Sequence, residues 1–536
     1  MRYLPLLIFV LSLIRCANII PPEGGPRDTI PPILIKSIPE NNSTGFKGNQ
    51  ITLEFNEPIQ LRNAKEEIII TPSTGKNTKY LFRKNLVTIQ PENKLDSATT
   101  YSIAFREAVR DLNEGNPAEA LKLAFSTGKI IDSLQISGRV YTILEGKPVE
   151  KFNVAIYSAD TFDITKHTPS YISSTDKRGR FNISNLKSGK YYIYAWEDRN
   201  KNLKVETNNE KFGTFPQIII LPDQKDSINI PIVKVDTRAI KLNNYRNISN
   251  YSIIRLNKVP KTLELKTLDG NKVDYHRGDS KNEIIAYPKK AYPDSVLVRL
   301  TATDSVNTST DSTFYIKQTK ATPLKEQFLI KASKPTYTAP TGILIAEYDV
   351  SLPLARISAD SINITADSTI IARLNQEDIK YDTTERKLRI EKRLMLPDSV
   401  AGKPLVITLR KGSLISIFSD TLRAQNEKIQ TRMEKDMATL IIATKVKKEG
   451  WITEIVNDRF VLLQSQPHNK QIVFKNLDAT NIQIRAFKDN NGNGTWDVNN
   501  PILRNPPEEI IFYKNEKGTT LTPLRANWTV EIEWDF

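Results

Sequence analysis

Short runs of alternating apolar and polar residues recur along almost the whole chain of 536 residues. Residues 51–55 and 86–89 are typical: isoleucine, leucine, valine and phenylalanine alternate with threonine and other polar residues. Turn-forming residues separate these runs at intervals of roughly ten residues, which is typical of β-sandwiches and not of alternating strands and helices. The pattern predicts an all-β protein built as a tandem array of β-sandwiches.

Chain length and cysteine content limit how such an array is stabilised. About 520 residues would remain after a leader, enough for roughly four to six domains. Cys16 is the only cysteine, so no disulfide can form within the chain, and each domain must be held by its own apolar core.

Residues 30–128 contain two local patterns of one known domain type. Phe55, Glu57 and Pro58 form an F-x-E-P corner after the strand at 51–55, and Leu95, Thr99 and Tyr101 form L-x-x-x-T-x-Y before a late strand. This unit resembles the bacterial immunoglobulin-like domain of surface-layer proteins. The surroundings of Tyr101 predict a tyrosine corner, with a buried ring and a hydroxyl that bonds the backbone.

Residues 133–235 have a different signature. The stretch from Thr175 to Phe181 reads T-D-x-x-G-x-F, and Leu186, Gly189 and Tyr191 follow as L-x-x-G-x-Y. This resembles the prealbumin-like fold of carboxypeptidase regulatory domains, which implies a seven-stranded accessory module without catalysis. Residues 437–536 repeat the end of this unit and are predicted to be a second prealbumin-like domain.

The two remaining units have weaker patterns. Residues 236–332 are predicted to be a further β-sandwich, and residues 333–436 a degenerate immunoglobulin-like domain whose strand at 343–348 resembles that at 51–55. Repeated modules of this kind predict sandwiches stacked as a rod or an arch. Residues 524–536 are rich in aromatic side chains, so we expect either a final core strand or a docking edge.

Residues 1–15 have a basic start and an apolar run that is too short to span a bilayer but suits a secretory signal peptide. Cys16 follows directly, so we expect acylation there, including palmitate, and anchoring in outer-membrane lipid. Arg15 is unusual directly before a lipidated cysteine, so the sequence leaves open whether standard lipoprotein processing takes place. Residues 16–32 form a Pro/Gly-rich tether that resembles Bacteroidota-type lipoproteins. The anchored chain could lie on either face of the outer membrane, and the cell surface is slightly favoured over the periplasmic face.

The net charge is +15, and would be +13 without Arg2 and Arg15. An exported chain does not meet nucleic acid, so we expect no nucleic-acid partner; anionic lipid, acidic glycans or an acidic protein surface are the candidates. No dense basic cluster occurs, which favours basic residues scattered over solvated strands.

One segment has the spacing of a calcium loop. Oxygen-bearing residues stand at positions 1, 3, 5, 7 and 9, with glycine at position 6, but Asn500 replaces the acid at position 12. Weak calcium binding and a polar hairpin turn are both compatible with this pattern. The candidate ligands are Asp489, Asn491, Asn493, Thr495 and Asp497. The related stretch from Asp198 to Leu203 has leucine at the glycine position.

Catalytic patterns are missing from the sequence. His167, His276 and His468 lie in three different predicted domains, and there is no nucleophile elbow, phosphate-binding loop or dinucleotide fingerprint. We therefore expect a chain that is not an enzyme, has no catalytic residues and needs no cofactor beyond weak calcium.

Asp-Ser or Asp-Thr followed by a small or aliphatic residue occurs more often than average composition would give. The pattern resembles the O-glycosylation sequon of exported Bacteroidota proteins, although Asp-Ser is also common turn chemistry. The candidate hydroxyls are those of Ser97, Ser133, Ser227, Ser295, Ser305, Ser361, Ser399 and Thr421.

These features predict a structural or binding subunit of a cell-envelope complex, with outer-membrane proteins as partners in assembly or export. The alternative is a surface lipoprotein that binds or processes glycans. A groove combining exposed tryptophans with a pair of carboxylates would favour the alternative, and the five tryptophans concentrate late in the chain.

Overall fold

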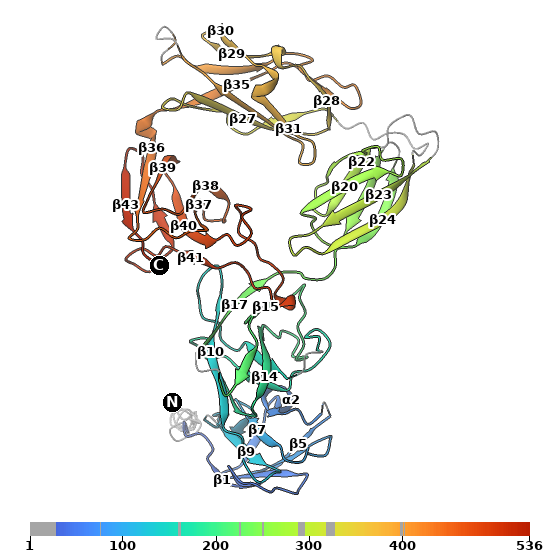
Figure 1. The fold of residues 1–536 in the computed structure, drawn as a ribbon, viewed down its shortest axis with the longest axis vertical. Helices are drawn as coiled ribbons and strands as arrows, with labels where there is room; N and C mark the ends of the chain where they lie inside the picture. The colour runs from blue at the N-terminus through green and yellow to red at the C-terminus, as the bar shows by residue number, and fades with distance from the viewer. Residues whose placement is uncertain are drawn as a thin grey trace, which may run out of the picture.

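The computed structural model describes residues 28–75, 77–119, 121–158, 162–223, 227–248, 251–287, 295–317, 327–396, 400 and 402–536. The chain is an all-β array of five sandwiches, as the alternation predicted (Figure 1). The predicted signal peptide, Cys16 and most of the tether lie outside the described residues. Among the described residues, no helix has the length and apolarity needed to cross a membrane.

The first sandwich packs the sheet β1-β2-β6-β5 on the sheet β4-β7-β9, with the pair β3-β8 at one end. In β2, Ile51, Leu53 and Phe55 are fully buried while Glu54 is exposed, so the alternation seen in the sequence identifies the inner face. The elements are β1 (Leu34–Ile38), β2 (Ile51–Phe55), β3 (Ile59–Leu61), α2 (Ala64–Glu67), β4 (Ile69–Thr71), β5 (Lys79–Arg83), β6 (Leu86–Gln90), β7 (Thr100–Ala104), β8 (Val109–Asp111) and β9 (Lys122–Ser126).

Tyr101 confirms the tyrosine corner. Its ring is 2% exposed and stacks on Phe125 at 5.7 Å between centroids. Its hydroxyl accepts a hydrogen bond from the backbone N–H of Asp96 at 2.8 Å.

The second sandwich has eight strands, where the resemblance implied seven. The extra strand arises because the long β14 pairs with β15 through Tyr194–Trp196 and with β16 through Gly189–Tyr191. The strands are β10 (Leu134–Thr142), β11 (Asn153–Tyr157), β12 (Tyr171–Ser174), β13 (Arg180–Leu186), β14 (Gly189–Trp196), β15 (Lys211–Thr214), β16 (Ile219–Leu221) and β17 (Ile228–Lys234).

The third and fourth sandwiches follow. The third packs the sheet β18-β19-β22-β21 on β20-β23-β24, and the fourth has a nine-stranded sheet with a separate pair, β28-β34. Their elements are β18 (Leu242–Ile248), β19 (Tyr251–Leu256), β20 (Thr262–Thr267), β21 (Asp274–Arg277), β22 (Glu283–Tyr287), β23 (Ser295–Thr303), β24 (Ser309–Lys317), β25 (Ile330–Ala332), β26 (Thr336–Thr338), β27 (Ile343–Val350), β28 (Leu354–Ile357), η1 (Ala359–Ser361), β29 (Ile362–Ala366), β30 (Thr369–Arg373), η2 (Gln376–Asp378), β31 (Ile379–Asp382), β32 (Lys387–Arg393), β33 (Leu405–Leu409), β34 (Leu414–Ser416) and β35 (Gln425–Arg432).

The fifth sandwich repeats most strand pairings of the second, although among its described strands no pair corresponds to β15 with β17. Its first and last strands, β36 and β43, pair in parallel as β10 and β17 do, and β40 pairs with both β41 and β42 as β14 does with β15 and β16. The elements are η4 (Glu434–Asp436), β36 (Met437–Ala443), β37 (Trp451–Val456), β38 (Leu462–Pro467), β39 (Gln471–Asp478), β40 (Asn481–Lys488), η5 (Pro501–Leu503), β41 (Ile510–Phe512), β42 (Leu521–Pro523) and β43 (Thr529–Glu533).

The C-terminal aromatic segment forms a core strand with one exposed ring. Its last strand, β43, pairs with β36, and Trp534 is 7% exposed in the core of the fifth sandwich. Trp528 is 55% exposed, with the guanidinium of Arg525 5.0 Å from its ring centre.

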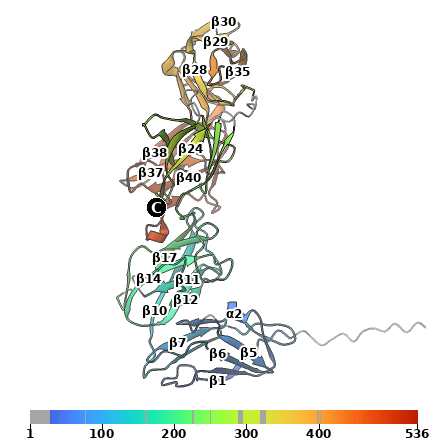
Figure 2. The same cartoon turned by 90° about the vertical axis from the view of Figure 1, so that its right-hand side faces the viewer.

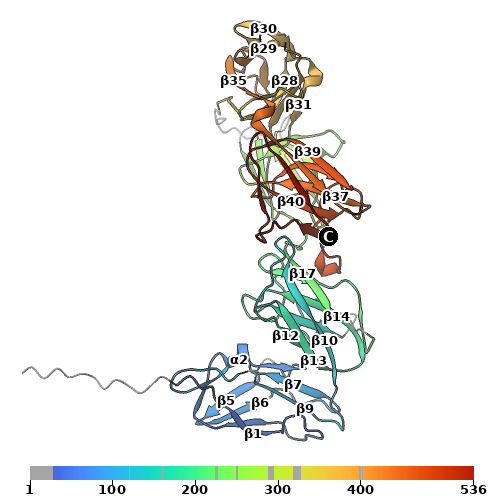
Figure 3. The same cartoon turned by 90° about the vertical axis from the view of Figure 1, so that its left-hand side faces the viewer.

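The five sandwiches are not arranged as a simple rod. The second to fifth sandwiches follow one another around a ring, so that the fifth returns to the second, and the first sandwich extends below (Figure 1). The two side views show the first sandwich at one end of a long molecule and the C-terminus near its middle (Figures 2 and 3). Contacts between the sandwiches therefore become the main candidates for functional surfaces.

Candidate functional site

The second sandwich has two buried faces, which makes it the centre of the assembly. Strand β11 is buried at all five positions, and β14 is buried from Tyr191 to Trp196. One face forms the inner core, and the other contributes to a second apolar cluster that includes Ile69 of the first sandwich, Val306 of the third, and Val498 and Ile502 of the fifth. A strand covered on both faces has a continuous apolar run in its sequence. The unbroken run Y-Y-I-Y-A-W at 191–196 is a feature from which this two-sided burial could have been predicted.

Contacts between the second and fifth sandwiches close the ring. The hydroxyl of Tyr194 donates a hydrogen bond to the carbonyl of Ile502 at 3.3 Å, and the guanidinium of Arg504 lies 4.1 Å from the ring centre of Tyr192. A further apolar cluster joins Ile143 of the second sandwich to Phe487 and Ile510 of the fifth. The 3-10 turn η5 lies beside β15 at this junction (Figure 1).

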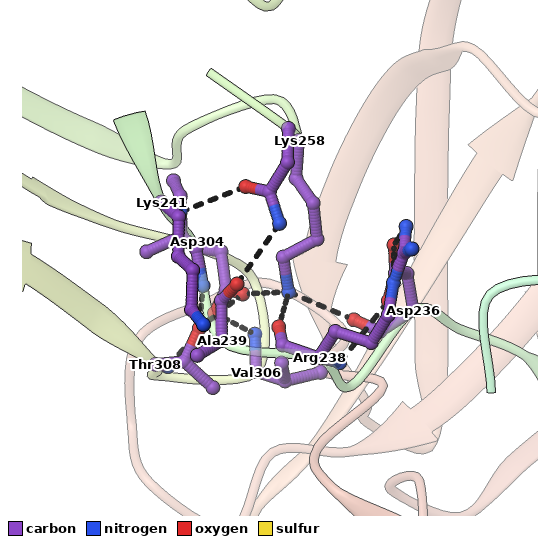
Figure 4. Close-up of polar contacts among 10 residues, drawn as sticks. Asp236, Arg238, Ala239, Lys241, Lys258, Asp304, Val306 and Thr308 are labelled. Carbon is purple, nitrogen blue, oxygen red and sulfur yellow. Dashed lines mark hydrogen bonds and ion pairs between the residues drawn. The ribbon is translucent and has the colours of Figure 1, made fainter. Parts of the chain in front are cut away.

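The joint between the second and third sandwiches contains a buried ion pair (Figure 4). The ammonium of Lys258 pairs with Asp304 Oδ2, and the two side chains are 8% and 3% exposed. Lys258 also donates to the carbonyls of Asp236, at 3.0 Å, and Arg238.

The carboxylate of Asp304 is surrounded by donors. It accepts from the backbone N–H groups of Val306 and Thr308 and from the Thr308 hydroxyl. Burial alone would raise the pKa of Asp304, but the hydrogen bonds from Lys258 and Thr308 hold that pKa below its ordinary value. The joint is thus fixed by charge as well as by apolar packing.

Polar contacts between the remaining neighbouring sandwiches complete the ring, beginning with those of Arg277 in the third sandwich to the fourth. The backbone N–H of Arg277 donates to the carbonyl of Thr384 at 2.8 Å, and its guanidinium pairs with Glu385 at 2.8 Å. Arg432 and Asp478 pair between the fourth and fifth sandwiches, and Lys261 of the third lies 3.5 Å from Asp497 of the fifth.

The candidate calcium loop is held by its own amides. Asp489 Oδ1 accepts from the backbone of Gly492 and Asn493, and Asp489 Oδ2 accepts from Gly494. The side-chain amides of Asn491 and Asn493 both donate to Asp497 Oδ2, at 2.7 and 2.6 Å. The amide nitrogens, and not the oxygens, thus point at the carboxylate in this structure.

The loop from Asp198 to Glu210 has the same geometry. Asn200 and Asn202 donate to Glu206 as the later asparagines donate to Asp497. Leu203 has φ of 59° where Gly494 has 74°, so leucine adopts the left-handed conformation that usually requires glycine. In each loop a further glutamate, Glu210 or Glu508, is 1–2% exposed and accepts two backbone N–H groups.

These two glutamates could not be recognised from the sequence pattern, because they lie outside the span of the calcium motif. Their presence explains how each loop keeps its shape. Among the described residues, no group of three or more His, Cys, Asp or Glu side chains is placed to hold a metal. Calcium binding at Asp489, Asn491, Asn493, Thr495 and Asp497 stays a prediction.

Six of the eight candidate glycosylation residues are exposed. Ser361 is half-buried, and Ser399 lies outside the described residues. The exposed residues are Ser97, Ser133, Ser227, Ser295, Ser305 and Thr421.

The three histidines lie far apart in the sequence and have different partners. His276 is 3% exposed, and its ring nitrogen Nε2 lies 2.8 Å from the Tyr287 hydroxyl. His468 Nδ1 lies 2.9 Å from the Thr453 hydroxyl, and His167 Nδ1 accepts from the backbone of Asp163. Each ring thus has a local structural partner.

A cavity of about 1100 Å³ lies between the first and second sandwiches. Residues of α2, β4 and the turn after β7 form one wall, and β12 with the Asp198 loop forms the other. Arg106 lines it, and its Nη2 atom is buried without a hydrogen-bond partner.

The family described as bacterial Ig-like domain matches residues 28–127. The first sandwich is therefore similar to a bacterial Ig-like domain. The matched residues agree, to within two residues at each end, with the unit predicted at 30–128. The match does not extend to the other four sandwiches. No curated protein sequence matched the chain.

The chain is distantly similar to several solved structures. The surface-layer protein SbsC, domains 1–6, is 10% identical with a TM-score of 0.16; the match covers 87% of this chain and 66% of SbsC. Dimeric latent PorU from Porphyromonas gingivalis is 11% identical with a TM-score of 0.23, over 64% of this chain and 45% of PorU. BcpA, the major pilin subunit of Bacillus cereus, is 9% identical with a TM-score of 0.12, over 75% of this chain and 98% of BcpA. Likenesses this distant say nothing about function.

Proposed function

We propose that this chain is a non-catalytic lipoprotein of the outer membrane that serves as a structural and binding subunit of a cell-envelope complex. Acylated Cys16 would anchor it in outer-membrane lipid, and outer-membrane proteins involved in assembly or export would be its partners. The observation that carries the proposal is the use of the interdomain surfaces: apolar clusters and buried polar contacts hold four sandwiches in a ring. A scaffold needs such fixed geometry, because its surfaces must meet several partners at once.

The tryptophans bear on the glycan-binding alternative. Trp196, Trp451 and Trp534 are buried, and Trp496 lies in the junction between the second and fifth sandwiches. Only Trp528 is exposed by more than half. Since glycan platforms need several exposed aromatic faces in one groove, no observation in the described structure favours this alternative.

Recovery of partners tests the proposal. The intact protein, tagged at its C-terminus, would be extracted from membranes and its partners identified by mass spectrometry. We expect outer-membrane proteins in stoichiometric amounts with the wild type. Cys16→Ser should lose palmitate labelling and leave the membrane fraction, while Ser97→Ala serves as a control that should keep both. Recovery of a monomer, or membrane retention of Cys16→Ser, would contradict the proposal.

Intact-mass measurement tests glycosylation separately. The native protein should be heavier than its polypeptide, and replacing the exposed serines at 97, 133 and 305 with alanine should reduce the excess stepwise. A native mass equal to that of the processed, acylated polypeptide would exclude modification at all eight candidate hydroxyls.

A further inference from the structure

The cavity between the first and second sandwiches differs from the other interdomain contacts because it is left open. Its volume of about 1100 Å³ is that of a ligand pocket, and junctions between domains are common places for such pockets. The cavity is lined by buried polar side chains that already have partners: the Thr71 hydroxyl donates to the Ser102 carbonyl, and the Asn153 amide donates to Asp198. Arg106 is the exception.

Arg106 lacks any acceptor among the described residues. Its Nη2 is shut off from solvent and unpartnered, and no ion pair joins the guanidinium to a described carboxylate. A buried donor without an acceptor is costly, so a folded protein rarely retains one without a reason. Arginine has five N–H donors in a rigid fork, which suits it to hold a ligand with several acceptors.

The backbone at Arg106 adds an independent observation. Its φ is 45°, a left-handed conformation that non-glycine residues adopt only at a cost. The N–H of Ala108 donates a hydrogen bond of 2.9 Å to the carbonyl of Phe105, which closes the turn. The Phe105 side chain is fully buried. The fold therefore keeps a strained turn that presents an unpaired guanidinium to the cavity wall.

The charges near Arg106 indicate what kind of group it would bind. Glu67 and Asp198 are close enough to act on the guanidinium electrostatically, although neither forms a hydrogen bond with it. Burial outweighs their attraction, so the pKa of Arg106 lies below its ordinary value. The lining as a whole is close to neutral, because four cationic side chains stand against five carboxylates: Lys65, Arg106, Lys151 and Lys201 against Glu66, Glu67, Glu107, Glu150 and Asp198. Arg106 Nη2 lacks a hydrogen-bond acceptor in a lining without a strong excess of either charge, which favours a neutral ligand rich in carbonyl oxygens.

The walls of the cavity distinguish a peptide from a sugar. Strands β4 and β12 are both edge strands of their sheets and both line the cavity, so each wall contains a strand with one side free of a strand partner. The lining includes one aromatic side chain, Tyr80, which is half-buried, so a stacking platform for sugar rings is missing there. We propose that the cleft between the first two sandwiches binds an uncharged, extended peptide segment of a partner protein, with Arg106 donating hydrogen bonds to its main-chain carbonyls.

Binding of capped peptides tests this inference. The intact protein would be screened by biolayer interferometry against immobilised ten-residue peptides of neutral sequence, acetylated and amidated at their ends, and against neutral oligosaccharides. We expect peptides to bind the wild type, and we expect Arg106→Gln to lower their affinity at least tenfold. Arg106→Lys keeps the charge between Glu67 and Asp198 but loses the fork, so it should weaken them as well.

Controls separate the outcomes. Arg83→Gln changes an exposed arginine of the same sandwich outside the cavity and should leave peptide affinity within twofold of the wild type. Cys16→Ser should bind peptides normally, so a failure of the anchoring proposal would not affect this result. No peptide binding, equal binding by folded Arg106→Gln, or Arg106-dependent binding of oligosaccharides alone would each overturn the proposal.

Discussion

Replacing Lys258 with methionine would leave the buried carboxylate of Asp304 without its cation. Breaking a buried ion pair by removing one partner costs about 3–5 kcal/mol, because the remaining charge is uncompensated. Asp304 would keep three donors, from the Val306 and Thr308 backbones and the Thr308 hydroxyl, and the carbonyls released at Asp236 and Arg238 lie near the surface. We therefore expect the lower end of this range, about 3 kcal/mol.

Hydrogen exchange suits this measurement because a chain of several domains does not unfold in two states. A local loss of about 3 kcal/mol should make the amides of Val306 and Thr308 exchange about a hundredfold faster. Lys241→Met, which changes an exposed lysine beside the same joint (Figure 4), should alter exchange little. Lys258→Met combined with Asp304→Asn should recover much of the loss, because no buried charge remains.

The pH dependence gives a second check. The pKa of folded Asp304 lies below its ordinary value, so its stabilising contribution is present above the ordinary pKa and is lost as the pH falls through the folded pKa. Protonated Asp304 does not need a cation, and the penalty of Lys258→Met should therefore shrink in acid. Equal exchange in Lys258→Met and Lys241→Met, or a penalty that stays constant as the pH falls, would refute the reasoning.

Three further predictions concern other parts of the chain. Ile143→Asp, in the cluster that joins the second and fifth sandwiches, should open the ring and raise the radius of gyration in X-ray scattering, whereas exposed Ile218→Asp should not. Calcium at about 1–10 mM should raise the melting temperature, and Asp489→Ala should abolish that rise; no rise in the wild type would favour the hairpin turn. Burial lowers the pKa of His276 to about 4, so acid should destabilise the third sandwich between about pH 6.5 and 4 by on the order of 3 kcal/mol. In His276→Gln the free energy of unfolding should depend less steeply on pH over this range.

Local features of the fold could be predicted because the relevant residues are close in sequence. The alternation at 51–55 identifies the inner face of β2, and the residues around Tyr101 predicted its bond to the Asp96 backbone. The repeat at 474–487 indicated a related module, and the antiparallel pairs β10–β13 and β11–β14 of the second sandwich recur in the fifth as β36–β39 and β37–β40. The eighth strand could not be predicted, because it depends on which half of β14 each neighbour meets.

The candidate sites depended more on tertiary contacts. The spacing at 489–497 indicated the loop, but the glutamate that holds it, Glu508, comes from a segment beyond the motif. Arg106 stands in an ordinary-looking turn, and only the approach of the second sandwich makes it a buried, unpaired donor in a cavity. No local pattern carries that information.

The sequence by itself determined that the chain is an array of β-sandwiches, because period-two alternation specifies which face of each strand is buried. Only the tertiary structure decided that the array closes on itself, with Tyr194 bonded to Ile502, more than 300 positions along the chain. The physical reason is that an apolar run such as that of β14 specifies burial on both faces but not the partner that covers the second one. That partner is chosen by the shapes of whole domains and by the joints between them.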